Sequence, residues 1–327
     1  MPPRTELRFT PANILGFAQK YSLYALDQAQ GYVPGGETAL TGKYANFRHT
    51  LVGDNQKIAY ILVERETQAG RNRAADFVVK PSLADTTGRG TRSYFLPWDA
   101  RGAAVEMTIP TFRNGDDANA NPPIFFTAVL SGCSIVFKGS DTKPTIFHCG
   151  TAGGAAGGNT AGDSNKFFKN MLINIRNQGL GRSGKAVGTQ VLSTDYMHTR
   201  AGGGAAPAHE TAFENTLKTH YDKQLIIENV NMWGTVFGFR TGTQWSFYLQ
   251  ENATITYRNV DDIMRHFITK AATNKTPGGF DLTRLTPGDL NAARIPVIQH
   301  ARPAVVKEVF PGTGHAVITS KWKTLRV

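Results

Sequence analysis

The chain has 327 residues, 40% of them hydrophobic, and its 36 basic and 25 acidic side chains give a net charge of +11 at pH 7. This length can bury a substantial core, and no apolar run approaches the roughly 18 residues of a membrane-spanning helix. Two cysteines are too few for a disulfide framework, so we expect free thiols and a reducing site of action. The positive charge is scattered, which favours a solvated basic surface over a nucleic-acid interface.

The clearest helix in the sequence is expected over residues 10–31. Thr10 suits the N-cap, Pro11 suits the first helical position, and Gly31 suits the C-cap. The apolar stripe of this helix would consist of Ile14, Ala18, Tyr21 and Ala25. Further helices are expected over about 208–222 and 261–271. The segment 164–178 fits either a helix or a helix followed by a strand.

Short β-rich runs follow the first helix at irregular spacing. They occupy residues 57–64, 76–80, 93–98, 105–110, 224–230, 234–240, 244–250 and 253–258. The pattern predicts an α+β fold of mixed or antiparallel sheets with flanking helices. We expect one domain over residues 1–327, made of an N-terminal extension (1–80), a core (85–260) and a C-terminal helix with strands (261–327).

A predicted hairpin carries the candidate chemistry. Its strands are residues 129–137 and 143–149, separated by the turn-like GSDT of residues 139–142. A four-residue loop places Lys138 opposite Lys143, and this register fixes every other cross-strand pair. The register determines which side chains of the two strands face one another.

In this register Cys133 lies opposite His148, with Cβ atoms about 4.5–5.5 Å apart. An imidazole within hydrogen-bond reach can take the proton of a thiol and leave a nucleophile. Gly132 would let a substrate approach the sulfur, and Thr127 lies on the same strand face and offers a hydroxyl. Cys149 should point to the opposite face, which argues against a disulfide with Cys133. From spacing alone the alternative stays open that the cysteine is a small core residue near an unrelated histidine.

The residues around this cysteine resemble those of a known toxin family. LSGC (130–133), followed by His148 in FHCG, resembles the catalytic motif of the toxin glutamine deamidases, which include cytotoxic necrotizing factor and Burkholderia lethal factor. FFTAVLSGC (125–133), with FLPW (95–98) upstream, is similar to the lethal-factor branch. The resemblance covers about residues 92–150 and leaves both ends of the chain unassigned.

The resemblance implies a β-sandwich-like core of mixed or antiparallel sheets surrounded by helices. It also implies acyl transfer without a cofactor or a metal. Cys133 would attack the carboxamide carbon of a glutamine, His148 would protonate the departing ammonia, and Thr127 would assist. The motif residues expected beside the oxyanion are Leu130, Ser131 and Gly132. Trp98 would either pack in the core or line the mouth of the site.

The same resemblance implies a bacterial toxin or effector, secreted or delivered, that deamidates a host protein in the host-cell cytosol. Family precedents for the substrate are small GTPases and a translation-initiation RNA helicase. A transglutaminase using the same thioester and a non-catalytic basic binding module are the alternatives. We expect a monomer without a membrane span and no nucleic-acid partner. The N-terminus MPPRTELRF lacks the layout of a secretory signal, which is compatible with a dedicated secretion apparatus, lysis or excision from a larger toxin.

Other motifs carry less weight. GLGRSGKA (179–186) nearly matches a phosphate-binding loop but has alanine where the magnesium-binding hydroxyl belongs. HETAFE (209–214) lacks the second histidine of a zinc-protease helix. His198, His209 and His220 have no metal-ligand spacing, so surface positions are expected.

Overall fold

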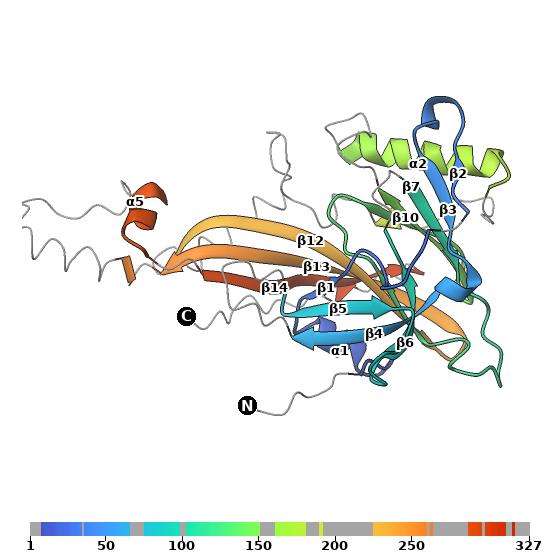
Figure 1. The fold of residues 1–327 in the computed structure, drawn as a ribbon, viewed down its shortest axis with the longest axis horizontal. Helices are drawn as coiled ribbons and strands as arrows, with labels where there is room; N and C mark the ends of the chain where they lie inside the picture. Colours follow the sequence, from blue (N-terminus) through green and yellow to red (C-terminus); the bar gives the residue numbers. More distant parts are fainter. Residues whose placement is uncertain are drawn as a thin grey trace, which may run out of the picture.

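Two β-sheets make up most of the computed structural model of the chain (Figure 1). The structure describes residues 8–34, 36–65, 75–98, 103–150, 161–180, 190–191, 225–259, 262–263, 287–295, 298–311 and 316–317. Some neighbouring strands run parallel, namely β1 with β5, β6 with β8 and β3 with β7, and the other pairs are antiparallel.

Counted over the residues that the structure describes, sheet A, the larger sheet, has nine strands and sheet B has six. In spatial order the strands of sheet A are β1 (Leu23–Ala25), β5 (Phe77–Ser82), β4 (Ile58–Arg65), β6 (Thr91–Leu96), β8 (Ile124–Thr127), β12 (Leu225–Thr241), β13 (Gln244–Asn259), β14 (Ile298–Phe310) and β15 (Ala316–Val317). Those of sheet B are β11 (Gln190–Val191), β9 (Ser134–Ser140), β10 (Lys143–Gly150), β7 (Ala103–Thr108), β3 (Arg48–Leu51) and β2 (Thr38–Ala39). Strands from the first 80 residues and from the C-terminal part therefore join the same two sheets as the central strands.

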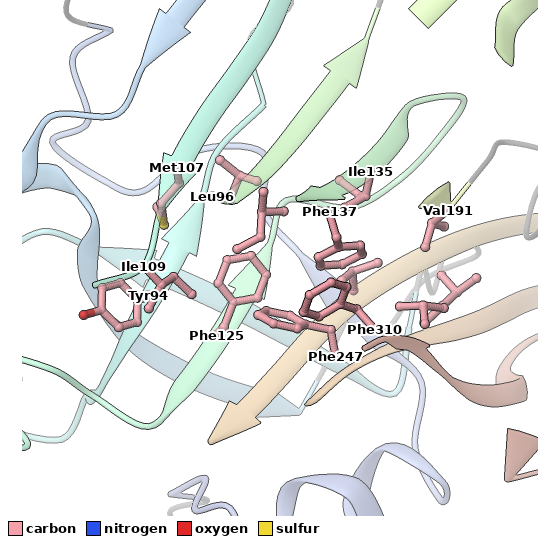
Figure 2. Packing of buried hydrophobic residues seen from close by; sticks show 14 of the residues in the cluster. Tyr94, Leu96, Met107, Ile109, Phe125, Ile135, Phe137, Val191, Phe247 and Phe310 are labelled. Atoms are coloured by element: carbon pink, nitrogen blue, oxygen red, sulfur yellow. The ribbon is translucent and has the colours of Figure 1, made fainter. Parts of the chain in front are cut away.

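The layer between the sheets is apolar and rich in aromatic rings. Phe125 and Phe247 of sheet A meet edge to face at 5.1 Å between ring centroids, and Phe137 of sheet B lies 5.0 Å from Phe247 (Figure 2). Phe310 stacks on Phe137 at 5.3 Å. Each fully buried side chain of this size contributes about 1.5–3 kcal/mol, and each such ring pair adds about 0.5–1.5 kcal/mol. This layer fixes the two sheets against one another.

Helices cover the outer faces of both sheets, as the predicted α+β class requires. Helix α2 (Ala161–Asn177) buries an apolar face against Val136, Phe147 and Cys149 on the outer side of sheet B. That face has the spacing of a helical stripe and consists of Phe168, Met171, Leu172 and Ile175. The ambiguous segment 164–178 is therefore helical. The remaining short helices are α5 (Pro287–Ala292), η1 (Gly42–Tyr44) and η2 (Asp54–Gln56).

The long helix expected over residues 10–31 is wrong, because α1 covers only Ile14–Ala18. The side chain of Gln250 ends it: its Nε2 donates to the carbonyls of Ala18 (2.6 Å) and Tyr21 (2.8 Å). Its Oε1 accepts from the Leu23 amide at 2.9 Å, where the chain turns into strand β1. Tertiary hydrogen bonds override the local helix signals here. The α1 helix still packs on the outer face of sheet A through Ile14 and Ala18.

Four of the predicted short strands are joined into two long ones. Residues 224–230 and 234–240 lie in β12, and residues 244–250 and 253–258 lie in β13. The two strands pair along almost their whole length around the turn at 242–243, with one irregularity between Ile227 and Asn229. Figure 1 shows β12, β13 and β14 extending together beyond the sandwich. The helix expected over 208–222, and that over 261–271 except residues 262–263, lie outside the described residues.

Candidate functional site

The candidate site lies where the chain crosses from sheet A to sheet B. Strand β8 ends at Thr127 and β9 begins at Ser134, so residues 128–133 form the crossover. Main-chain hydrogen bonds hold it: the Val129 amide donates to Ala25, and Leu130 exchanges two hydrogen bonds of 2.8 and 3.0 Å with Gly234. Cys133 is the last residue of the crossover and directly precedes β9.

The mouth of the site is formed by the last part of this crossover. Ser131 and Gly132 are exposed, and Cys133 beneath them retains 6% of its surface. Gly132 has φ +121°, a conformation that favours glycine over any residue with a Cβ. The sulfur is therefore close to the surface but largely covered.

The predicted hairpin register is wrong by two residues. Ser140 pairs with Lys143 around a two-residue turn, Ile135 pairs with His148, and Cys133 is not opposite His148. The turn is tighter than expected, and Gly139 beside it adopts φ +83°, where an added Cβ would collide with the Lys143 carbonyl. A shift of two residues leaves each side chain on its original face.

The predicted shared face is confirmed. Ile135 and Ile146 both enter the inter-sheet core, and by alternation Cys133 and His148 lie on this same face of sheet B. Cys149 points to the opposite face and packs under α2, as expected, and both cysteines are free thiols. Diagonal neighbours in a sheet lie about 7–8 Å apart, within reach of a long side chain but farther than a directly opposed pair.

His148 is fully buried, and neither of its ring nitrogens has a hydrogen-bond partner among the described residues. The expected thiol–imidazole hydrogen bond is therefore not made in this structure. Burial lowers the pKa of His148 to about 3. The imidazole is consequently neutral at pH 7, with one nitrogen able to accept a proton.

Cys133 is also neutral at pH 7. Burial raises its thiol pKa to about 12, the negative charge of Asp27 adds to this effect, and a hydrogen bond from the Ser131 backbone partly opposes it. Asp27 is an exposed residue, but neighbouring residues partly cover its carboxyl group. This partial loss of solvation raises the pKa of the carboxyl. The resting site thus contains a neutral thiol and a neutral imidazole, with a carboxyl group near its mouth.

Thr127 lies on the face of sheet A that looks toward sheet B. It is the last residue of β8, pairs with Leu96, and by alternation shares its face with Phe125 of the inter-sheet core. Its buried hydroxyl donates to the Ala128 carbonyl at 2.8 Å. The structure places Thr127 in the same layer as the thiol and imidazole, but its hydroxyl hydrogen bond goes to the backbone.

Trp98 lies directly beside the cysteine. A Cβ added to Gly150 would overlap the indole Nε1 of Trp98 and come within 3.0 Å of the Cys133 sulfur, so both atoms flank the same backbone carbon. The ring is partly exposed and packs against the cores on both sides of sheet A. Both alternatives for Trp98 therefore apply, because it packs in the core and also borders the sulfur.

The motif residues expected to bind an oxyanion are only partly available. The Leu130 amide is occupied by its 2.8 Å hydrogen bond to Gly234, and its side chain is core. The Ser131 amide already faces the Cys133 sulfur. Sequence reasoning missed Asp27 and Gly150, whose proximity depends on contacts between distant segments and carries no local signal.

A cavity of about 580 Å³ lies at the other end of the sandwich. Lys143, at the opposite end of β10 from His148, is one of its lining residues, together with Lys57, Tyr94 and Arg113. This cavity does not include the cysteine, so it is separate from the candidate site.

Several sequence motifs fall outside the part of the chain that the structure describes. They are residues 181–186 of the phosphate-loop match, the HETAFE segment, and His198, His209 and His220. Within the described ranges no group of histidine, cysteine, aspartate and glutamate could hold a metal ion. No helix among the described residues has the length and apolarity needed to cross a membrane.

Comparison of the chain with models of known protein families and with curated proteins found no match.

Proposed function

We propose that this protein is a cysteine-dependent protein-glutamine deamidase of the toxin type, acting on a host protein in the host-cell cytosol. The observation that carries the proposal is a thiol beneath an exposed glycine loop, with a buried imidazole on the same sheet face that has no hydrogen-bond partner among the described residues. The LSGC resemblance supplies the reaction class. A buried histidine without such a partner is costly, and a catalytic role would explain why it is kept.

The neutral thiol and imidazole of the resting site favour proton transfer during the attack over a preformed ion pair. The pKa of His148, about 3, and that of Cys133, about 12, both oppose this transfer, so substrate binding must change the surroundings of the two groups before it occurs. The imidazole of His148 takes the thiol proton as the Cys133 sulfur attacks the glutamine carboxamide carbon. The resulting tetrahedral species collapses with cleavage of the C–N bond, and His148 returns the proton to the departing ammonia. Water, activated by the same imidazole, then hydrolyses the thioester to glutamate and regenerates the thiol. Catalytic hydrogen bonds are often long before substrate binds, and the diagonal geometry requires the two side chains to approach one another.

Transglutamination is the second candidate, and Asp27 is the observation that favours it. A carboxylate that acts electrostatically on the Cys133 sulfur would also attract a protonated amine to the thioester. The small GTPases and the RNA helicase of the toxin family are the first substrates to test. Adding a labelled primary amine to the assay separates the two outcomes, because only transglutamination incorporates the label.

The test is a mass-spectrometric survey of a host-cell lysate treated with the protein. New glutamine-to-glutamate sites should appear with the wild type and with Cys149→Ala, because Cys149 faces away from the site. They should be absent with Cys133→Ala. Thermal melting of each variant confirms folding. Sites that persist with Cys133→Ala, or a lysate without any new site, would contradict the proposal.

A further inference from the structure

We infer that the indole N–H of Trp98 donates a hydrogen bond to the substrate carbonyl oxygen as it becomes an oxyanion. This inference rests on the proposed function and adds a residue to it. It concerns the side-chain nitrogen of a tryptophan, whereas the LSGC resemblance implies backbone amides for this role.

The backbone of Trp98 is fixed from two directions. Its amide donates to the Asp27 carbonyl at 2.9 Å, and its carbonyl accepts from Gln28 Nε2 at 3.3 Å. The ring is wedged between the inter-sheet core and the core outside sheet A. A side chain held in this way presents its N–H in one direction, which is what preorganised catalysis requires.

The indole nitrogen is buried and has no hydrogen-bond partner among the described residues. An indole N–H is a donor only, and buried tryptophans usually find an acceptor. The nitrogen and the Cys133 sulfur flank Gly150, where any side chain would displace one of them. The indole nitrogen without a partner and the sulfur therefore lie against the same glycine, close enough for a group bonded to the sulfur to reach the indole.

The backbone leaves room for a second donor at this place. The Leu130 amide is occupied by Gly234, so it cannot serve an oxyanion without breaking the crossover. The Ser131 amide donates to the sulfur in the resting state and stays beside it when the C–S bond forms. Oxyanion sites typically combine more than one donor, and the Trp98 indole is the side-chain donor at the sulfur.

Trp98→Phe removes the N–H and keeps an aromatic ring. We expect kcat for deamidation to fall about 10²–10³-fold with KM little changed, which is the cost of one oxyanion donor. The matched control is Trp245→Phe, because Trp245 is also a buried tryptophan whose indole nitrogen has no partner among the described residues. The rate of Cys133 alkylation by iodoacetamide should be the same in all three proteins, because that reaction forms no oxyanion.

A second measurement does not require turnover. A short aliphatic aldehyde adds to the thiol as a hemithioacetal, whose oxygen occupies the oxyanion position. In ¹⁵N-labelled protein, the indole signal that Trp98→Phe removes should shift on adduct formation, and the Trp245 signal should stay. An adduct at Cys133 with an unmoved Trp98 signal, or an unchanged kcat in Trp98→Phe, overturns the inference while the proposed function stands. A wild type that shows neither turnover nor a Cys133 adduct overturns both.

Discussion

The buried His148 makes the stability of this protein depend on pH in a calculable direction. Burial lowers the pKa of its imidazole from an ordinary 6.5 to about 3. The unfolded chain therefore binds this proton more tightly than the native state does. The stabilising effect is complete above pH 6.5 and is lost as the pH falls toward 3. The gap between the two pKa values corresponds to about 5 kcal/mol, of which about 3 kcal/mol is lost by pH 4.

Replacing His148 with phenylalanine keeps a planar ring and removes the titration. Free energies of unfolding from urea titrations between pH 7 and pH 4 give one stability curve for each protein. The wild type should lose about 3 kcal/mol more than the variant over this range, whatever the offset between the curves at pH 7. Parallel curves, or an NMR titration that gives this imidazole an ordinary pKa in the native state, would refute the reasoning.

Three further outcomes are expected. Alkylation of Cys133 by iodoacetamide at pH 8 should be about 10³-fold slower in the folded than in the unfolded protein, because burial raises its pKa to about 12; a rate that levels off below pH 8 would instead indicate a preformed thiolate. Gln250→Leu should destabilise the protein by about 3 kcal/mol in urea unfolding, because it leaves three main-chain groups of the N-terminal segment unpaired, two of them buried and one partly buried. A cost within that of a surface substitution would contradict this. Glu106→Ala should cost about 2–4 kcal/mol, because it leaves the buried His49 without its 2.9 Å partner, and Glu106→Gln should retain part of that hydrogen bond and cost less in the same assay.

The sheet-rich fold could be predicted from the sequence because strand signals are local. β-branched and aromatic runs marked β4 to β7 and β10 within two residues of their observed bounds. The strand expected over 129–137 was wrong at its start, because residues 129–133 belong to the crossover and β9 begins at Ser134. The helix over 10–31 could not be corrected from the sequence, since its end depends on Gln250, more than 220 residues away. The break expected at residues 231–233 was wrong for a related reason. Pairing with β13 through these residues keeps the segment extended.

The sequence allowed a correct prediction of which side chains share a face of the sheet, but not of how far apart they lie. Alternation along β10 separates His148 from Cys149 whichever register the hairpin adopts, because slips of two residues preserve the pattern. The register itself follows from the loop length, which is two residues and not four, and the positive φ of Gly139 beside the turn is not revealed by any spacing rule. The neighbours of Cys133 at the mouth, Asp27 and Trp98, come from other segments and depend on the tertiary fold.

The proposed catalytic groups come from both sheets, which the crossover at residues 128–133 connects. Cys133 directly precedes β9 and His148 lies in β10, so both belong to sheet B. Trp98 follows β6 and belongs to sheet A. The apolar packing between the layers and the hydrogen-bonded crossover set their spacing, and a misplacement of about 1 Å between reacting groups can slow a reaction about 10²-fold. Exchanging a ring such as Phe137 or Phe247 for a smaller side chain would then act as a remote adjustment of rate, leaving every group at the sulfur chemically intact.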